Sequence, residues 1–221
     1  MFLSDKAGKF IGPQLLRQRY ICHKAIIIPV RVNSFMLKLT PVNIFRKKNN
    51  LLIIIRGAPS TGKTTVAYLL SRKIPHAYKI SVDSLTGMFT LPGSESKEWK
   101  QVRPLGQELA RILTDYLLNQ GKTVIAEEVF PEVRYISDLE GVAKKNKVKS
   151  YVFELITPME ILSQREGVRP DAKADKPVKK LAGYIQQNPY PGAIKINTAP
   201  LSATHCAESI LGTIPANHVN K

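Results

Sequence analysis

Residues 51–70 read LLIIIRGAPSTGKTTVAYLL, an apolar run that breaks at GAPSTGKT and then resumes with helical spacing. Positions 51–55 are continuously apolar and rich in β-branched residues, which is typical of a strand that is buried on both faces. After the break, apolar residues recur at helical spacing up to Pro75, which cannot continue a helix. This stretch therefore predicts a buried strand, a loop and a helix, in that order.

The break itself, residues 57–64, fits the pattern of a phosphate-binding loop. Gly57 and Gly62 allow the loop to turn its backbone N–H groups toward a phosphate chain at close range. Lys63 supplies a positive charge for the β- and γ-phosphates, Thr64 supplies a hydroxyl for Mg²⁺, and the following helix N-terminus adds a partial positive charge. A turn without a ligand would need neither the lysine nor the paired glycines. We therefore expect ATP and Mg²⁺ to bind at nine residues: Gly57, Ala58, Pro59, Ser60, Thr61, Gly62, Lys63, Thr64 and Thr65.

Positive charge is concentrated in the first 50 residues. The chain of 221 residues has a formal net charge of +16, and residues 1–50 contribute ten Lys and Arg against the single acid Asp5. The remaining 171 residues carry a net charge of only +7, so the charge balance does not favour a nucleic-acid partner for the whole protein. Three interpretations of residues 1–50 stay open: an upstream extension with the natural start nearer Met36, a basic targeting arm, or an accessory strand or helix.

The length of the chain favours one α/β domain with some additional sequence. We expect a basic, poorly ordered N-terminal extension at residues 1–50, a catalytic domain at residues 51–214 and a short tail at residues 215–221. Cys22 and Cys206 are too few for a disulfide framework or a four-ligand zinc site, which suits a reducing compartment. Since no apolar run approaches the length that spans a bilayer, we expect a cytoplasmic protein without a membrane partner.

Acidic side chains follow two further predicted strands. Residues 77–82 lead into Asp83, and residues 123–126 lead into Glu127 and Glu128. Because ligands of parallel sheets collect at the carboxyl ends of the strands, we expect Asp83 to face the bound phosphates or the group that receives them, although aspartate is also a good helix N-cap. Alternation along the strand sends Glu127 and Glu128 to opposite faces. We favour Glu127 for the magnesium side, and expect Glu128 to meet solvent, a helix end or a basic group.

Two segments have the composition of loops that cover a substrate. Residues 91–103 are polar and carry the only tryptophan, and we predict that they form a loop that contacts the phosphate acceptor. Arg165 and Arg169 are four residues apart, so they share one face of a helix, and residues 167–177 are charged and contain two prolines, as a lid does. Arginines that close over transferring phosphates neutralise developing charge. The alternative is a pair of ordinary surface arginines.

Strand and helix patterns alternate along the chain after the phosphate loop. Further strands are predicted at residues 77–82, 123–126, 149–156 and 193–197, with helices between them. This order predicts a three-layer α/β/α P-loop NTPase domain of the kinase type, with a five-stranded and mostly parallel sheet. An acid after the second strand and an arginine lid after the fourth favour a small kinase over a motor, a transporter or a GTPase, and the sequence has no guanine-specifying Asn-Lys-x-Asp.

The sequence resembles the chloramphenicol phosphotransferase-like family of small P-loop kinases over roughly residues 51–214. Four stretches carry the resemblance: the phosphate loop, VDSL at 82–85, VIAEEVF at 124–130 and IKINT at 194–198. That family transfers the γ-phosphate of ATP to a hydroxyl of a small acceptor. The resemblance implies that Asp83 is the catalytic base and that Arg165 or Arg169 is the lid arginine.

This chain also departs from the family pattern. The paired aspartates that the family has after its third strand are Glu127 and Glu128 here, and the acceptor loop differs. Because acceptor choice is set by loops that vary on a common fold, the resemblance implies kinase chemistry and leaves the acceptor open. We expect an ATP-dependent phosphotransferase acting on a hydroxyl-bearing small molecule. A polynucleotide or nucleoside kinase, and an ATP-binding regulator whose basic leader binds nucleic acid, stay open as alternatives.

Overall fold

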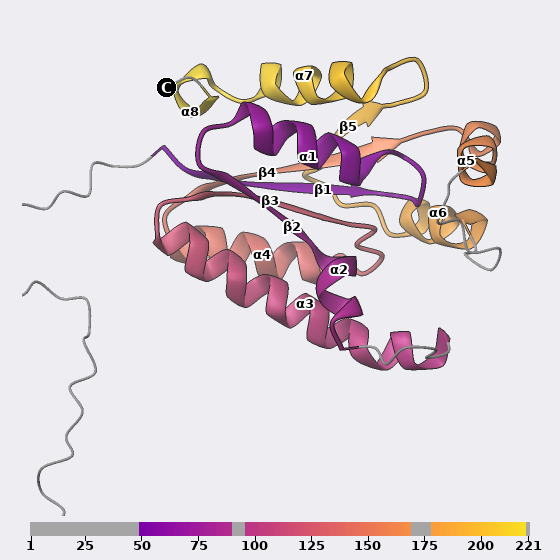
Figure 1. Cartoon of the computed structure of the whole chain (residues 1–221), viewed down its shortest axis with the longest axis horizontal. Coiled ribbons are helices and arrows are strands. Elements are labelled where there is room, and N and C mark those ends of the chain that lie inside the picture. The colour runs from indigo at the N-terminus through magenta and orange to yellow at the C-terminus, as the bar shows by residue number, and fades with distance from the viewer. Residues whose placement is uncertain (1–48, 90–95, 169–177, 220–221) are drawn as a thin grey trace, which may run out of the picture. The chain divides into compact units, whose positions relative to one another are not determined.

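The apolar run at positions 51–55 lies in the central strand of a five-stranded parallel sheet (Figure 1). A computed structural model describes residues 49–89, 96–168 and 178–219 of the chain. The strand order is β2-β3-β1-β4-β5, and each neighbouring pair is parallel. All seven residues of β1 (Leu51–Gly57) are buried, because helices cover both faces of the sheet.

The remaining elements alternate along the chain. The other strands are β2 (Ala77–Ser81), β3 (Thr123–Glu128), β4 (Lys149–Ile156) and β5 (Ile194–Asn197). The described helices are α1 (Lys63–Lys73), α2 (Val82–Gly87), α3 (Ser96–Asn119), α4 (Arg134–Lys145), α5 (Met159–Gly167), α6 (Val178–Gln187), α7 (Ala203–Thr213) and α8 (Ala216–Val219). No helix in the described ranges is long and apolar enough to cross a membrane.

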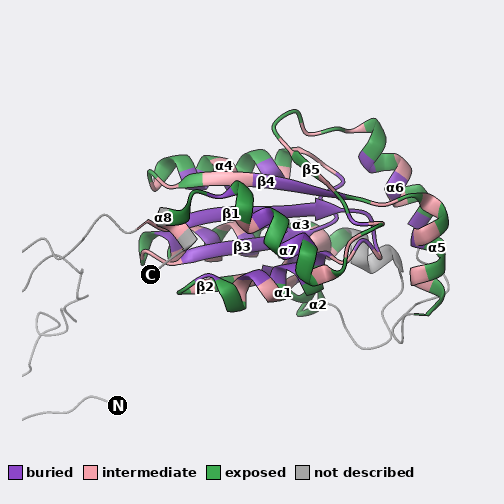
Figure 2. Cartoon of the chain, turned by 90° about the horizontal axis from the view of Figure 1, so that it is seen from above, coloured by how far each residue is buried: buried purple, intermediate pink, exposed green. Residues whose placement is uncertain are grey.

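Alternate residues of β1 belong to two different cores. Leu51, Ile53 and Ile55 pack with residues of α1 and α7 on one face of the sheet, whereas Leu52 and Ile54 pack with residues of α3 and α4 on the other. Figures 1 and 2 show the two helical layers on either side of the sheet and the buried strands between them. The predicted three-layer α/β/α fold of the kinase type, with its five-stranded sheet, is confirmed.

The segment predicted as an acceptor loop is partly helical. Residues 96–103 form the first two turns of α3, and Pro104 lies inside the same helix. Residues 91–95 lie outside the described ranges. The loop prediction is wrong for residues 96–103, because the polar sequence of these helical turns carries no apolar stripe that would have indicated a helix.

A close approach between α2 and α3 shapes the edge of the sheet next to β2. A Cβ atom on Gly106 would lie 2.0 Å from Thr86 Oγ1, so only glycine allows α3 to pass α2 at this distance. Thr86 itself is buried and donates a hydrogen bond of 2.9 Å to the carbonyl of Val82. The contact holds α2, the short helix that contains Asp83, against α3.

Candidate active site

The phosphate loop follows β1 at the edge of the sheet where the parallel strands end (Figure 1). A Cβ atom on Gly57 would lie 2.7 Å from the carbonyl oxygen of Leu155 in β4, so this position accepts only glycine without a shift of the backbone. Gly62 has φ +92°, a left-handed conformation that glycine adopts without strain. Ser60 has φ 64° and is a non-glycine residue in the same region. Both predicted glycine positions therefore have a geometric cause.

Thr61 of the loop and Lys63 of α1 both direct their side chains to the carbonyl of Ala58. Lys63 is 8% exposed, and its Nζ atom donates a hydrogen bond of 2.9 Å to the carbonyl of Ala58. Thr61 Oγ1 donates to the same carbonyl at 2.9 Å. No side chain caps the N-terminus of α1, and its first turn has no acidic residue. This helix end therefore presents its partial positive charge next to the loop, with no acidic side chain in its first turn to offset it.

The two glutamates that end β3 have different partners. Thr64 Oγ1 donates to the carboxylate of Glu127, at 3.2 Å from each oxygen, and Lys79 Nζ is 4.0 Å from Glu127 Oε1. Arg103 Nη2 donates to Glu128 Oε1 at 2.7 Å. The predicted alternation of the two side chains is confirmed, and of the alternatives for Glu128 the neighbouring basic group is the one observed.

The donor set around Thr64 fits Mg²⁺. A hydroxyl and a carboxylate are the hard oxygen ligands that this ion takes, usually together with waters and substrate phosphates. Within the described ranges no three His, Cys, Asp or Glu side chains cluster as a ready-made metal cage. A magnesium ion here would therefore be held by Thr64, Glu127 and the phosphates of its nucleotide, and this assignment stays a prediction.

Asp83 lies in the first turn of α2, directly after β2. The predicted strand at 77–82 ends one residue early, because Val82 already begins the helix. The N-cap position belongs to Ser81, so the alternative that Asp83 is the N-cap is wrong. Asp83 is exposed, and its charge acts on Glu128, whose pKa it raises. Asp83, Glu128 and Lys63 therefore belong to one electrostatic site, since Lys63 also acts on the pKa of Glu128.

Burial raises the pKa of Glu128 from an ordinary 4.5 to about 7, and the nearby charge of Asp83 adds to the effect. Arg103 and Lys63 oppose this shift by favouring the ionised carboxylate. Glu128 is 2% exposed, so water does little to stabilise its charge. The carboxyl group of Glu128 is consequently divided between its neutral and charged forms near neutral pH.

The stability of the metal-free protein should fall as the pH rises from about 4.5 to about 7 because of Glu128. Over this range the unfolded chain releases the Glu128 proton while the folded chain retains it, which favours unfolding by roughly 3 kcal/mol in total. Glu128→Gln should remove this contribution. Urea titrations of both proteins at pH 5 and pH 7.5 measure the difference, with Glu132→Gln, whose carboxylate is only partly buried and pairs with the exposed Arg134, as the control. An identical pH dependence in Glu128→Gln and wild type would contradict the shift.

Of the two predicted lid arginines, one lies within the described residues and one does not. Arg165 on α5 donates to Thr198 Oγ1 at 3.2 Å and to the Thr198 carbonyl at 3.0 Å, so it contacts the segment after β5. Arg169 lies outside the described ranges. Glu166 of α5 also contacts the phosphate loop, since its Oε2 accepts a hydrogen bond from Ser60 Oγ.

Sequence reasoning did not identify five residues at this edge: Arg56, Arg103, Glu154, Glu166 and Thr198. Arg56 carried a usable signal, because a charged residue that ends an otherwise apolar buried strand needs a partner. Thr198 ends the IKINT stretch that carried the family resemblance. The sequence carried no such signal for Arg103 or Glu166, since charged residues in polar segments are usually exposed.

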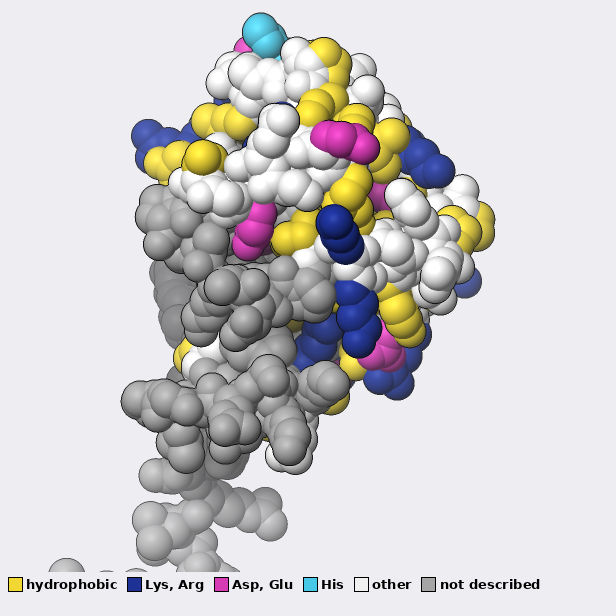
Figure 3. Space-filling model, turned by 90° about the vertical axis from the view of Figure 1, so that its right-hand side faces the viewer, with side chains coloured by type: hydrophobic (Ala, Val, Ile, Leu, Met, Phe, Trp, Pro, Cys, Tyr) yellow, Lys and Arg dark blue, Asp and Glu magenta, His cyan; other side chains and the backbone are white. Residues whose placement is uncertain are grey.

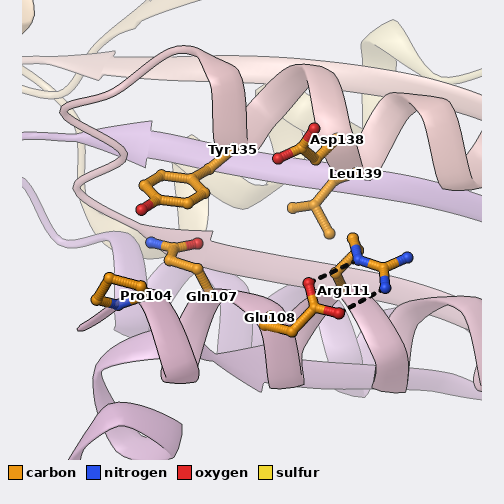
Figure 4. Close-up of a pocket in the computed structure, with 7 residues that line it drawn as sticks. All are labelled: Pro104, Gln107, Glu108, Arg111, Tyr135, Asp138 and Leu139. Atoms are coloured by element: carbon orange, nitrogen blue, oxygen red, sulfur yellow. Dashed lines mark hydrogen bonds and ion pairs between the residues drawn. The ribbon is translucent and has the colours of Figure 1, made fainter. Parts of the chain in front are cut away.

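A small pocket lies between α3 and α4, away from the phosphate loop (Figure 4). Its volume is about 60 Å³, far below the roughly 300–1,000 Å³ of typical small-molecule sites. Gln107 of α3 and Tyr135 of α4 point toward each other across it. The molecular face at the end of the sheet carries acidic and basic side chains side by side (Figure 3), so it is not uniformly basic.

The fold and the loop define a P-loop domain of the kinase type. A sequence profile described as an AAA domain matches residues 52–187, and the chain belongs to this family. A search of curated proteins found no match.

Several solved structures share the fold. The tunicamycin resistance protein of Deinococcus radiodurans has a TM-score of 0.57 and 20% identity, covering 74% of this chain and 95% of that chain. Thymidylate kinase from Candida albicans has a TM-score of 0.53 and 15% identity, covering 77% and 94%. The Mycobacterium tuberculosis APS kinase, in complex with AMPPNP and APS, has a TM-score of 0.51 and 16% identity, covering 74% and 96%. At these identities the likeness shows the fold, and the narrower resemblance to chloramphenicol phosphotransferases stays a prediction.

Proposed function

We propose that this protein is an ATP-dependent kinase that transfers the γ-phosphate of ATP to a hydroxyl group of a small molecule. One observation carries the proposal: the end of β3 places Glu127 beside Thr64 of α1 and Glu128 within electrostatic reach of both Lys63 and Asp83. A nucleotide site and an acceptor site need these two groups of side chains next to each other. Membership of the AAA domain family and the kinase-type fold support the same class.

The nucleotide side of the site consists of the loop and α1. Backbone N–H groups of residues 57–64 and the charge of Lys63 bind the phosphate chain. Thr64 and Glu127 would hold Mg²⁺, which when bound supplies positive charge to the β- and γ-phosphates. Together these groups hold the γ-phosphate in line with an acceptor on the Asp83 side.

Asp83 acts on the acceptor. Its carboxylate accepts a hydrogen bond from the acceptor hydroxyl and takes the proton as the oxygen attacks the γ-phosphorus. The new bond joins the acceptor oxygen to phosphorus, the bond from phosphorus to the β–γ bridging oxygen breaks, and ADP leaves. Asp83 is exposed, so an incoming hydroxyl has access to it.

Arg165 and Arg169 remain our candidates for the arginine that neutralises the transferring phosphoryl group. Arg165 would have to exchange its two hydrogen bonds to Thr198 for contacts with the phosphates. Such an exchange is feasible in energy, because a phosphate oxygen is a stronger acceptor for a guanidinium than a hydroxyl or a carbonyl.

A screen of hydroxyl compounds tests the proposal. The purified protein is incubated with MgATP and antibiotics, sugars, nucleosides or oligonucleotides, and products are detected by their mass gain of one phosphate. Transfer to a small molecule that is lost in Asp83→Asn supports the proposal. Transfer only to the end of an oligonucleotide would indicate a polynucleotide kinase. Tight ATP binding without transfer to any compound would contradict kinase activity and favour an ATP-binding regulator.

Glu166→Gln should bind ATP about three- to tenfold more tightly than the wild type. The Glu166 carboxylate contacts Ser60, so its negative charge lies beside the loop that we propose binds the phosphates. Glutamine keeps the size of the side chain and removes the repulsion between the two negative groups. Calorimetric titration with MgATP measures the change, with Glu160→Gln in the first turn of the same helix as the control. Weaker ATP binding in Glu166→Gln would contradict this interpretation.

A further inference from the structure

Arg56 is a fully buried charge at the end of the central strand. It is the residue before Gly57, has 0% exposure, and pairs in register with Glu128 of β3 and Glu154 of β4. Burying a guanidinium costs free energy unless its N–H groups have good acceptors. The guanidinium of Arg56 should therefore have hydrogen-bond acceptors around it.

Three acceptors from three segments surround the guanidinium. Its Nη1 atom donates to Glu154 Oε2 at 2.9 Å, Nε donates to the carbonyl of Phe130 at 3.1 Å, and Nη2 donates to the carbonyl of Asn188 at 2.6 Å. Phe130 lies in the turn after β3 with φ 45°, a conformation that a bulky residue rarely adopts. Asn188 directly follows α6. One side chain thus connects β4, the turn after the Glu127–Glu128 pair, and the end of α6.

An apolar cluster joins nearly the same segments. It consists of Ala58 of the phosphate loop, Val129 of the turn after β3, Leu162 of α5, and three residues of α6: Val178, Ala182 and Ile185. Apolar contacts hold these segments together, but they do not fix how one segment is oriented relative to another. The planar guanidinium holds its N–H groups in a rigid fork. Its hydrogen bonds have fixed directions, so they set the orientation of the segments that the apolar cluster leaves undetermined.

We propose that Arg56 is a positioning residue that sets the turn after Glu127 and Glu128, and the end of α6, relative to the phosphate loop. The step to catalysis rests on the proposed function, because the carboxylates that Arg56 positions are those assigned to the metal and acceptor sides. Arg56 itself has no exposed surface, so we expect it to act through its neighbours and not through contact with a substrate. Its loss should shift the carboxylates while the backbone N–H groups of the phosphate loop keep their place.

The test must separate positioning from the ion pair with Glu154. The double variant Arg56→Met with Glu154→Met removes both buried charges together, and buried pairs replaced in this way often keep their stability. Arg56→Lys keeps the charge but cannot make three divergent hydrogen bonds. Arg111→Met removes the exposed pair of Arg111 with Glu108 on α3, at 2.6 Å, and serves as the matched control.

Two readouts are compared in folded variants. In the double variant and in Arg56→Lys, kcat per nucleotide-binding site should fall about tenfold to a hundredfold, while the KM for ATP stays within about threefold of wild type. Amide hydrogen exchange should rise about tenfold or more at residues 184–190, where the end of α6 loses its anchor. Arg111→Met should match the wild type in both measurements.

The outcomes separate this inference from the proposed function. Amide exchange at residues 184–190 that stays at the wild-type rate in Arg56→Lys would overturn the inference about Arg56. An equal loss of kcat and of ATP affinity would also overturn it, because it would indicate general disruption of the fold. If the double variant fails to fold, Arg56→Lys decides alone. If the wild-type protein transfers no phosphate at all, the proposed function fails, and the exchange measurement still decides whether Arg56 positions the end of α6.

Discussion

Lys63→Ala should raise the Kd for ATP by about tenfold or more and lower kcat/KM for phosphoryl transfer by about a hundredfold to a thousandfold. The Nζ atom lies across the loop, 2.9 Å from the carbonyl of Ala58, and the residue is 8% exposed. A charge in these poorly solvated surroundings interacts with phosphate oxygens more strongly than a surface lysine does. Titration with a fluorescent ATP analogue and initial-rate kinetics on the same preparation measure both effects.

A second lysine of the same helix is the matched control. Lys73, at the end of α1, forms an exposed ion pair with Glu208 at 3.4 Å. Lys73→Ala should leave ATP binding and transfer close to the wild-type values, since exposed pairs contribute little. Unchanged ATP affinity in Lys63→Ala would remove the main reason to regard residues 57–64 as a nucleotide site.

Asp83→Asn should lower the rate of transfer by about a hundredfold to ten-thousandfold while leaving the Kd for ATP within about threefold of wild type. Asparagine preserves the size of the side chain in the first turn of α2 but cannot accept the proton of the attacking hydroxyl. ATP affinity should persist because the phosphate-binding groups come from the loop and α1. Single-turnover transfer to the acceptor found in the screen, measured together with ATP binding, separates the two effects.

Asp138→Asn on the exposed face of α4 controls for the loss of a surface carboxylate. It should transfer phosphate at the wild-type rate. Transfer near the wild-type rate in Asp83→Asn would show that Asp83 is not the base. Glu128 would then be the next residue to test, because it lies near Asp83 and Lys63 and has a pKa of about 7.

The phosphate loop and the parallel sheet were predictable because their signals are local. A run of apolar residues in β1 requires cover on both faces, and the position of Gly62 requires a backbone that only glycine adopts easily. Alternation along β3 was enough to predict that Glu127 and Glu128 diverge. The boundaries of α2 and α3 were less predictable, because a short helix and two polar helical turns lack the apolar period on which such predictions rest.

The partners of the site residues required the tertiary structure. Alternation could not say which glutamate meets Thr64, since that depends on how β3 is placed beside β1 and on the direction in which α1 leaves the loop. Arg103 and Glu128 are 25 residues apart in sequence, and their contact depends on α3 passing close to α2 at Gly106. The partner of Arg165 was equally unpredictable from the sequence, because its side chain contacts Thr198, which is 33 residues away along the chain.

By itself, the sequence determined a buried strand, a phosphate-binding loop with Lys63 and Thr64, and a parallel α/β fold of the kinase type. These features follow from backbone sterics and hydrophobic period within a few neighbouring residues. Only the tertiary structure decided that Glu127 faces Thr64, that Glu128 pairs with Arg103 near Asp83, and that Arg56 joins β4, the turn after β3 and the end of α6. A hydrogen bond between segments up to 132 residues apart, such as that from Arg56 to Asn188, leaves no local pattern, because it depends on where the packed core places both ends.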